Sequence, residues 1–245
     1  MAFVLATEEA PRFLEVGTSA ATRKPCFETR NRPENCEFVD CIVDARLVAV
    51  CQDLKHLIVM IGEHFARKSR LPHHVFHSVI SSTQSRLLQM RDGVSCITGE
   101  CLRLGVLAFV TIIAFRIPCG SGQSREDVEV KPETAKQRPY LASHLRDACQ
   151  AVEPSTPHLD RMLFWALTIG AMAVFDISKE DWLVEKWAYL SNKLHPNVFL
   201  WEHAREDLDS ILWIRCVHDE WGQKLFKQLM ARSRLVKKGE VRQIS

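Results

Sequence analysis

The sequence predicts an all-α protein, a multi-helix bundle of antiparallel helices with two buried central hydrophobic helices. Apolar residues recur at intervals of three and four along most of the chain after residue 37, which places them on one face of a helix. Two runs, residues 104–115 and 162–175, are almost entirely apolar, as expected for helices that are surrounded by other helices. No alternating strand pattern of useful length is present in the sequence.

The composition is that of an ordinary globular protein. Hydrophobic residues make up 47% and charged residues 25% of the 245 residues, which supports one large domain. The net charge of +2 is too small for the whole surface to bind nucleic acid. Both apolar runs are shorter than the roughly 20 residues that span a bilayer, so we expect no membrane segment. Nine cysteines without regular spacing, and an N-terminus without a signal-peptide pattern, favour reduced thiols in an intracellular protein.

The periodicity divides the chain into three regions. Residues 1–36 are aperiodic, and we expect a loose or disordered leader. Residues 37–230 are expected to form the helical domain, which residues 119–139 interrupt as a polar mobile loop or a linker containing Gly and Pro. Residues 231–245 read as a basic frayed tail.

The first helix is predicted from a stripe of apolar residues in steps of four or three. The stripe resembles a short coiled-coil seam. Two interpretations therefore stay open, a helix packed within its own domain and a dimerisation scaffold. The first is favoured, because the stripe lasts too few heptads to require a partner. The stripe consists of Val39, Val43, Leu47, Val50, Leu54, Leu57, Ile61 and Phe65.

Proline and glycine mark where the next helices are expected to begin and end. Pro72 is expected to open a helix whose apolar side is Val75, Val79, Leu87 and Leu88, and which ends at residues 92–93. Further helices are expected from Glu100 to Pro118, through Leu141, Leu145, Cys149 and Val152, over residues 160–175, and over residues 181–194.

The last two helices are predicted within residues 200–230. One face of the first carries Trp201, Ala204, Leu208, Ile211 and Leu212, while Glu202, Arg205, Glu206 and Asp209 face away. A second apolar series consists of Trp213, Val217, Trp221 and Leu225. We expect a bend at residues 218–222, with Asp219 as N-cap of a last helix that ends near Met230.

No complete metal site is found in the sequence. Structural zinc favours closely spaced cysteine pairs, and four residues separate Cys36 from Cys41 and Cys96 from Cys101. His73 and His77 lie one helical turn apart, which is a weak metal signal.

No complete catalytic constellation is found either. His218 and Asp219 are similar to the paired ligands of helical metal-dependent phosphohydrolases, although capping at a bend explains them better. The carboxylates of residues 206–209 read as a solvated helix face. We therefore expect no catalytic residue, no metal and no cofactor, and a hydrolase using His218 and Asp219 stays open as an alternative.

Three stretches, in order, carry a resemblance to a known family. Residues 100–118 contain Glu100, Cys101, Arg103 and Leu104 before an apolar run; residues 163–194 contain Trp165, Gly170 and Trp182; residues 211–229 contain Trp213, Asp219 and Gly222. Together they resemble the regulatory domain of fungal-specific transcription factors, the helical region downstream of a zinc binuclear cluster.

The resemblance implies a nuclear regulatory domain that acts by protein–protein or ligand binding. Its partners would be transcription machinery or regulatory proteins, with a small-molecule effector as a further ligand, and a homodimer stays open. The cluster of that family begins with two cysteines two residues apart, and this sequence lacks such a pair. Zinc and direct nucleic-acid binding are therefore not carried over, and no ligand-contacting residue is assigned.

Overall fold

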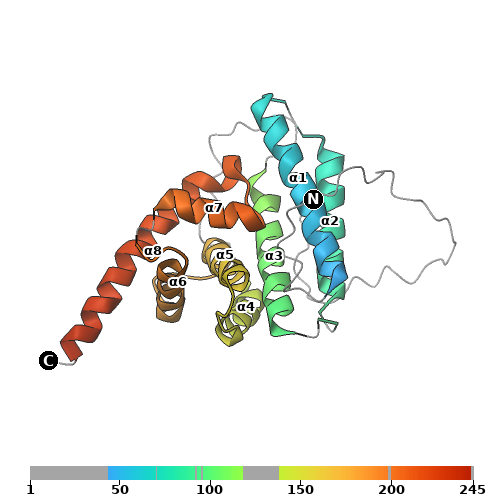
Figure 1. The fold of residues 1–245 in the computed structure, drawn as a ribbon. Helices are drawn as coiled ribbons and strands as arrows, with labels where there is room; N and C mark the ends of the chain where they lie inside the picture. The colour runs from blue at the N-terminus through green and yellow to red at the C-terminus, as the bar shows by residue number, and fades with distance from the viewer. Residues whose placement is uncertain are drawn as a thin grey trace.

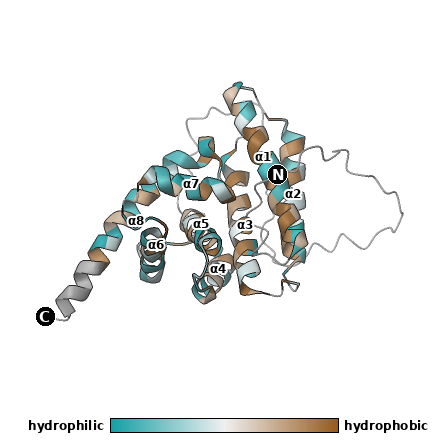
Figure 2. Cartoon of the chain, viewed as in Figure 1, coloured by the Kyte–Doolittle hydropathy of each residue, from teal (hydrophilic) through white to brown (hydrophobic). Residues whose placement is uncertain are grey.

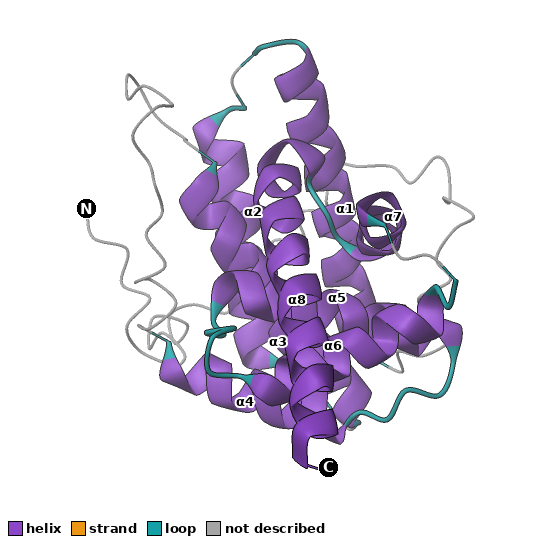
Figure 3. Cartoon of the chain, turned by 90° about the vertical axis from the view of Figure 1, so that its left-hand side faces the viewer, coloured by secondary structure: helices purple, strands orange, loops and turns teal. Residues whose placement is uncertain are grey.

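The fold is an all-α bundle, as predicted (Figure 1, Figure 3). The computed structural model describes residues 44–69, 71–91, 93–94, 96–117, 138–197 and 200–243, except for the side chains of residues 115 and 237–243. Within these ranges the chain forms helices and no strand. The helices are α1 (Ala45–Ala66), α2 (His73–Gln89), α3 (Ile97–Arg116), α4 (Pro139–Ala151), α5 (Pro157–Ala173), α6 (Asp181–Leu194), α7 (Trp201–Ile211) and α8 (Arg215–Gln243). The predicted leader, and residues 119–137 of the predicted loop, lie outside the described residues.

Helices α3 and α5 contain the two apolar runs and pack against each other. Figure 2 shows the hydrophobic colouring of α3 in the middle of the bundle. Gly105 allows the close approach of the two helices, because a Cβ at this position would lie 2.7 Å from the ring of Trp165. One window of α3, Ile97–Ala114, is long and apolar enough to cross a membrane, and 72% of it is buried inside the structure, as in the core helix of a soluble protein.

Helix α1 begins where Asp44 caps it, since the Asp44 carboxylate accepts the backbone N–H of Arg46 at 2.9 Å. The predicted apolar stripe is buried within this chain from Leu47 to Ile61. Phe65, the last predicted member, is 48% exposed, so the stripe ends one turn earlier than predicted. Val39 and Val43 lie outside the described residues.

Helix α2 faces the core with only part of the predicted side, since Leu87 is buried as predicted. Phe76, Ile80 and Leu87 are buried, whereas Val75 and Val79 are only half-buried. The same face continues through the buried polar side chains of Thr83 and Gln84, which interrupt the hydrophobic signal in the sequence. Because of this interruption, the sequence pattern assigns Val75 and Val79 to the buried face in place of Phe76 and Ile80.

Helices α4 and α6 follow the prediction closely. The apolar side of α4 is buried at Leu141, Leu145 and Cys149, and Val152 is buried just beyond the helix. Lys186 of α6 holds the end of α4, because its Nζ donates to the carbonyl oxygens of Cys149 at 2.6 Å and Val152 at 2.9 Å. These bonds satisfy carbonyl groups that the end of a helix leaves without internal partners.

Candidate functional site

The turn between α7 and α8 lies earlier than the sequence predicts. Helix α7 ends at Ile211 and α8 begins at Arg215, so residues 212–214 turn the chain and residues 218–222 lie inside a helix. The predicted bend, and the predicted end near Met230, are therefore wrong. Gly222 has a packing role instead: a Cβ there would lie 2.7 Å from the Trp213 ring and 2.8 Å from the Trp201 ring.

His218 is fully buried in the first turn of α8, and Asp219 lies inside this helix instead of acting as its N-cap. Nδ1 of His218 accepts the backbone N–H of Ile214 at 3.0 Å. The rings of Phe109 and Trp213 flank the imidazole, with centroids 5.3 and 4.9 Å away. Burial, together with the positive charge of Arg116, lowers the pKa of His218 to about 3, so the imidazole is neutral at physiological pH.

Asp219 forms polar contacts that His218 does not form, although both side chains contact Trp213. One carboxylate oxygen accepts the indole N–H of Trp213 at 2.7 Å, and the other lies 3.8 Å from Nη1 of Arg205. Among the described residues, no group of three or more His, Cys, Asp and Glu side chains could hold a metal ion. The adjacent His218 and Asp219 therefore act as separate structural contacts at this junction.

Arg116, at the end of α3, completes the junction, and sequence reasoning missed it. Its guanidinium carbon lies 3.9 Å from the ring centroid of Trp221, a cation–π arrangement. Burial lowers the pKa of Arg116, while the nearby Glu220 opposes this effect. Nε of Arg116 and Nε2 of His218 are both buried and make no hydrogen bond in the structure. The junction therefore combines the guanidinium groups of Arg116 and Arg205, the Asp219 carboxylate, one neutral imidazole and three indole rings.

The other predicted candidates that the structure describes do not assemble into one site. The rings of His73 and His77 contact each other on α2, with centroids 4.0 Å apart and planes tilted by 46°. The Cys96 sulfur caps α3 by accepting the backbone N–H of Gly99 at 3.3 Å. Cys101 is buried and packs instead against Cys149, with the two sulfur atoms 3.6 Å apart. Cys36 and Cys41 lie outside the described residues.

A second polar cluster surrounds Asp207, which was predicted to lie on a solvated face. Asp207 is instead buried, with 7% of its surface exposed. One carboxylate oxygen lies 2.7 Å from Nε2 of His195, and the other lies 3.4 Å from Nε of Arg161. The ring of His203 stacks on His195 with centroids 5.0 Å apart. The cluster joins the start of α5, the end of α6 and α7, and no spacing in the sequence relates these three segments.

Comparisons with protein-family models, with curated proteins and with solved structures found no match for this chain.

Proposed function

We propose that this chain is a helical regulatory domain of a fungal transcription regulator and acts by binding a regulatory protein or a small molecule. The proposal starts from the ordered resemblance of residues 100–118, 163–194 and 211–229. What supports it is the way these three stretches pack in the structure.

Trp165 is the residue at which the three stretches meet. Gly105 and Phe109 of the first stretch lie against its ring, with the Phe109 and Trp165 centroids 6.3 Å apart. Its own stretch forms the buried helix α5. Its indole N–H donates to the carbonyl oxygen of Leu212, in the third stretch, at 2.8 Å. Each of the three motifs is weak evidence by itself, but all three contact the same buried residue, Trp165. This observation carries the proposal.

The first stretch also has a structural reason for its charged residues. Arg103 is buried and binds the Glu100 carboxylate through two hydrogen bonds of 2.6 and 2.7 Å. A third bond of 2.9 Å joins its Nη1 to the carbonyl oxygen of Leu87, in α2. These contacts fix α2 against the start of α3. The pair therefore needs no catalytic explanation.

Neither alternative gains a specific observation. A metal-dependent hydrolase would require His218 and Asp219 to converge, and they bind Ile214 and Trp213 instead. A dimerisation scaffold would require an available stripe on α1, and that stripe is buried inside this chain from Leu47 to Ile61.

A reporter assay tests the proposal. The chain is fused to a heterologous DNA-binding domain, and transcription of a reporter with the matching site is compared with that of the DNA-binding domain alone at equal protein level. We expect the fusion to change transcription in at least one nutrient condition. A reporter without the site is the control and should not respond. Unchanged transcription in every condition would contradict the proposal.

A further inference from the structure

Two buried nitrogen atoms at the α3–α8 junction lack the acceptors that buried donors normally have. Nε2 of His218 and Nε of Arg116 are inaccessible to solvent and make no hydrogen bond in the structure. Nε of Arg205, beside Asp219, is a third such atom. Buried polar groups in proteins are almost always paired, so several unpaired donors in one place require an explanation. The side chains of His218 and Arg116 face the same part of α8, because Arg116 lies over Trp221, three residues after His218, and its positive charge acts on the imidazole.

The tautomer of His218 makes its orphan nitrogen a donor. Because Nδ1 accepts the N–H of Ile214, it holds a lone pair, and the ring proton of the neutral imidazole lies on Nε2. The Nε of an arginine is also a donor and never an acceptor. The missing partner must therefore offer acceptor atoms to both groups.

The charge balance of the junction identifies the partner as an anion. Arg116 carries one positive charge in a partly buried position. The two acids of the junction have other cations as partners. Glu220, which acts on the charge of Arg116, is exposed and accepts from Nζ of Lys224 at 2.7 Å. Asp219 lies 3.8 Å from Nη1 of Arg205. One negative charge on an oxygen acceptor would neutralise Arg116 and satisfy both orphan donors.

The surroundings favour an anion with an apolar body. Aromatic rings line both donors: Phe109 and Trp213 flank His218, and Trp221 lies beneath the guanidinium of Arg116. Ligand sites commonly combine such apolar walls with a few converging polar groups. We propose that the α3–α8 junction binds a small monocarboxylate, whose oxygen atoms accept hydrogen bonds from Nε2 of His218 and from Arg116. This inference rests on the proposed function and deepens it by naming the class of effector.

Equilibrium dialysis of the purified full chain with radiolabelled benzoate or propionate tests the site, and it is independent of transcription. We expect saturable binding of one equivalent in sodium chloride of matched ionic strength. Arg116→Gln and His218→Asn should each weaken binding about 10- to 100-fold, because each removes a hydrogen bond to a charged group. In His218→Asn, the carboxamide oxygen of the new side chain retains an acceptor for the N–H of Ile214.

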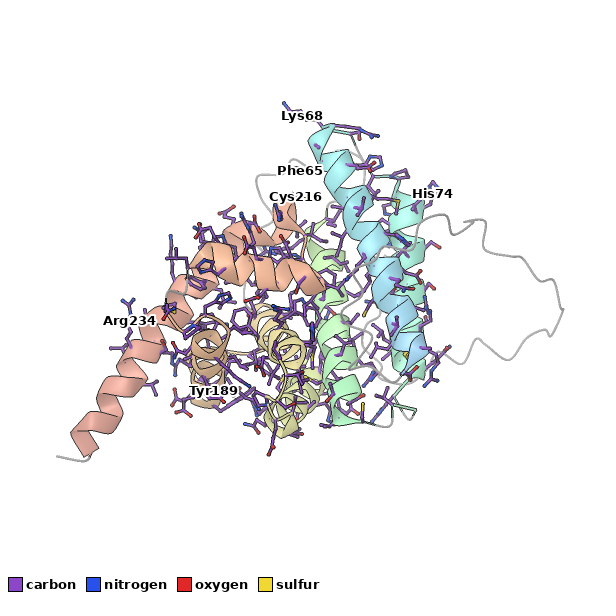
Figure 4. The ribbon with its side chains drawn as sticks, in the orientation of Figure 1. Phe65, Lys68, His74, Tyr189, Cys216 and Arg234 are labelled. Atoms are coloured by element: carbon purple, nitrogen blue, oxygen red, sulfur yellow. The ribbon has the colours of Figure 1, made fainter. Side chains whose placement is uncertain are left out.

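Arg234→Gln is the matched control, because Arg234 is exposed on the part of α8 that extends beyond the other helices (Figure 4). It makes the same Arg→Gln change, with the loss of one positive charge, away from the junction, and it should leave binding unchanged. The circular dichroism spectrum verifies folding, and Arg116→Gln tests the site even where His218→Asn unfolds the chain. No saturable binding of either acid, or equal binding by the folded variants and the parent chain, would overturn the site. Equal binding of nitrate would overturn the assignment to carboxylates. A site that binds benzoate in a chain without effect on the reporter would leave the inference standing and the transcriptional role rejected.

Discussion

Trp213 donates its indole N–H to the carboxylate of Asp219 at 2.7 Å, across six residues of the chain. The bond joins the turn at residues 212–214 to the first turns of α8 and satisfies the only polar atom of a ring that is 3% exposed. The tryptophan can therefore serve as a core residue without an unpaired donor.

Replacement of Trp213 by Ala should destabilise the fold strongly. A buried tryptophan contributes both transfer free energy and packing, and its truncation costs about 3 to 5 kcal/mol. This is a large share of the roughly 5 to 15 kcal/mol that holds a domain together. Urea unfolding followed by circular dichroism measures the change. An unchanged free energy of unfolding would mean that the ring does not pack in the interior.

Trp213→Phe separates the ring from its hydrogen bond. The phenyl ring keeps most of the apolar contact with Trp201 and His218 but cannot donate to Asp219. Because the Asp219 side chain is 30% exposed and can be hydrated, the lost bond itself should cost only about 1 kcal/mol. The smaller ring adds to this cost, so the total, measured by the same urea unfolding, should lie between that value and the cost of Trp213→Ala.

Two glycines in helices should respond to alanine with opposite signs. Gly222→Ala would place a Cβ within 2.8 Å of two tryptophan rings, and we expect a loss of about 1 to 3 kcal/mol from overpacking. Gly62 lies inside α1, and a Cβ added there would have no heavy atom within 4 Å. Gly62→Ala should therefore stabilise the protein by about 0.5 to 1 kcal/mol through helix propensity. Thermal unfolding of both variants measures the contrast, and equal signs would contradict it.

The elements that could be predicted from the sequence are those with an uninterrupted local pattern. Helix α6 begins and ends at the predicted residues, because its buried side chains Val184, Trp187 and Leu190 repeat every three or four positions. The bend before α8 was misplaced since Gly222 looks like a helix breaker in isolation. Only the packing of two distant tryptophan rings explains why a glycine lies there.

The polar contacts could not be predicted for a similar reason. Arg116 and His218 are separated by about a hundred residues, and no periodicity relates the end of α3 to the start of α8. Asp207 likewise looks like its exposed neighbours in the sequence, although its buried position depends on where α5 and α6 lie. Local patterns determine which face of a helix is apolar. They do not determine which charged side chain another helix will cover.

Asp207 and Asp209 form a matched pair that tests this distinction. Asp207→Asn removes the negative charge from a buried carboxylate between His195 and Arg161, and we expect a loss of about 1 to 3 kcal/mol. Asp209→Asn breaks a pair with Arg215, whose side chain is 64% exposed, and surface pairs contribute about 0 to 1 kcal/mol. Chemical denaturation at pH 7 compares them. An equal or larger loss at Asp209 would show that Asp207 is solvated.

The buried imidazole of His218 should make the fold sensitive to acid. Its pKa is about 3 in the folded protein, against an ordinary value of 6.5. Between these values the unfolded chain binds a proton that the folded chain does not, so stability is fully present above pH 6.5 and is lost as the pH falls toward 3. Carboxyl groups also titrate in the lower part of this window, so the effect of His218 must be isolated by a difference between two proteins.

His218→Asn provides that difference, because asparagine does not titrate and its Oδ1 can accept the N–H of Ile214 in place of Nδ1. The free energy of unfolding is measured for both proteins at about pH 7 and about pH 4.5, on either side of the ordinary histidine pKa, in a buffer without carboxylates. All other titrating groups are shared, so the parent chain should lose more stability over this interval than the variant. Parallel losses would show that the imidazole accepts a proton at Nδ1 in the folded state, at the expense of its bond from the N–H of Ile214.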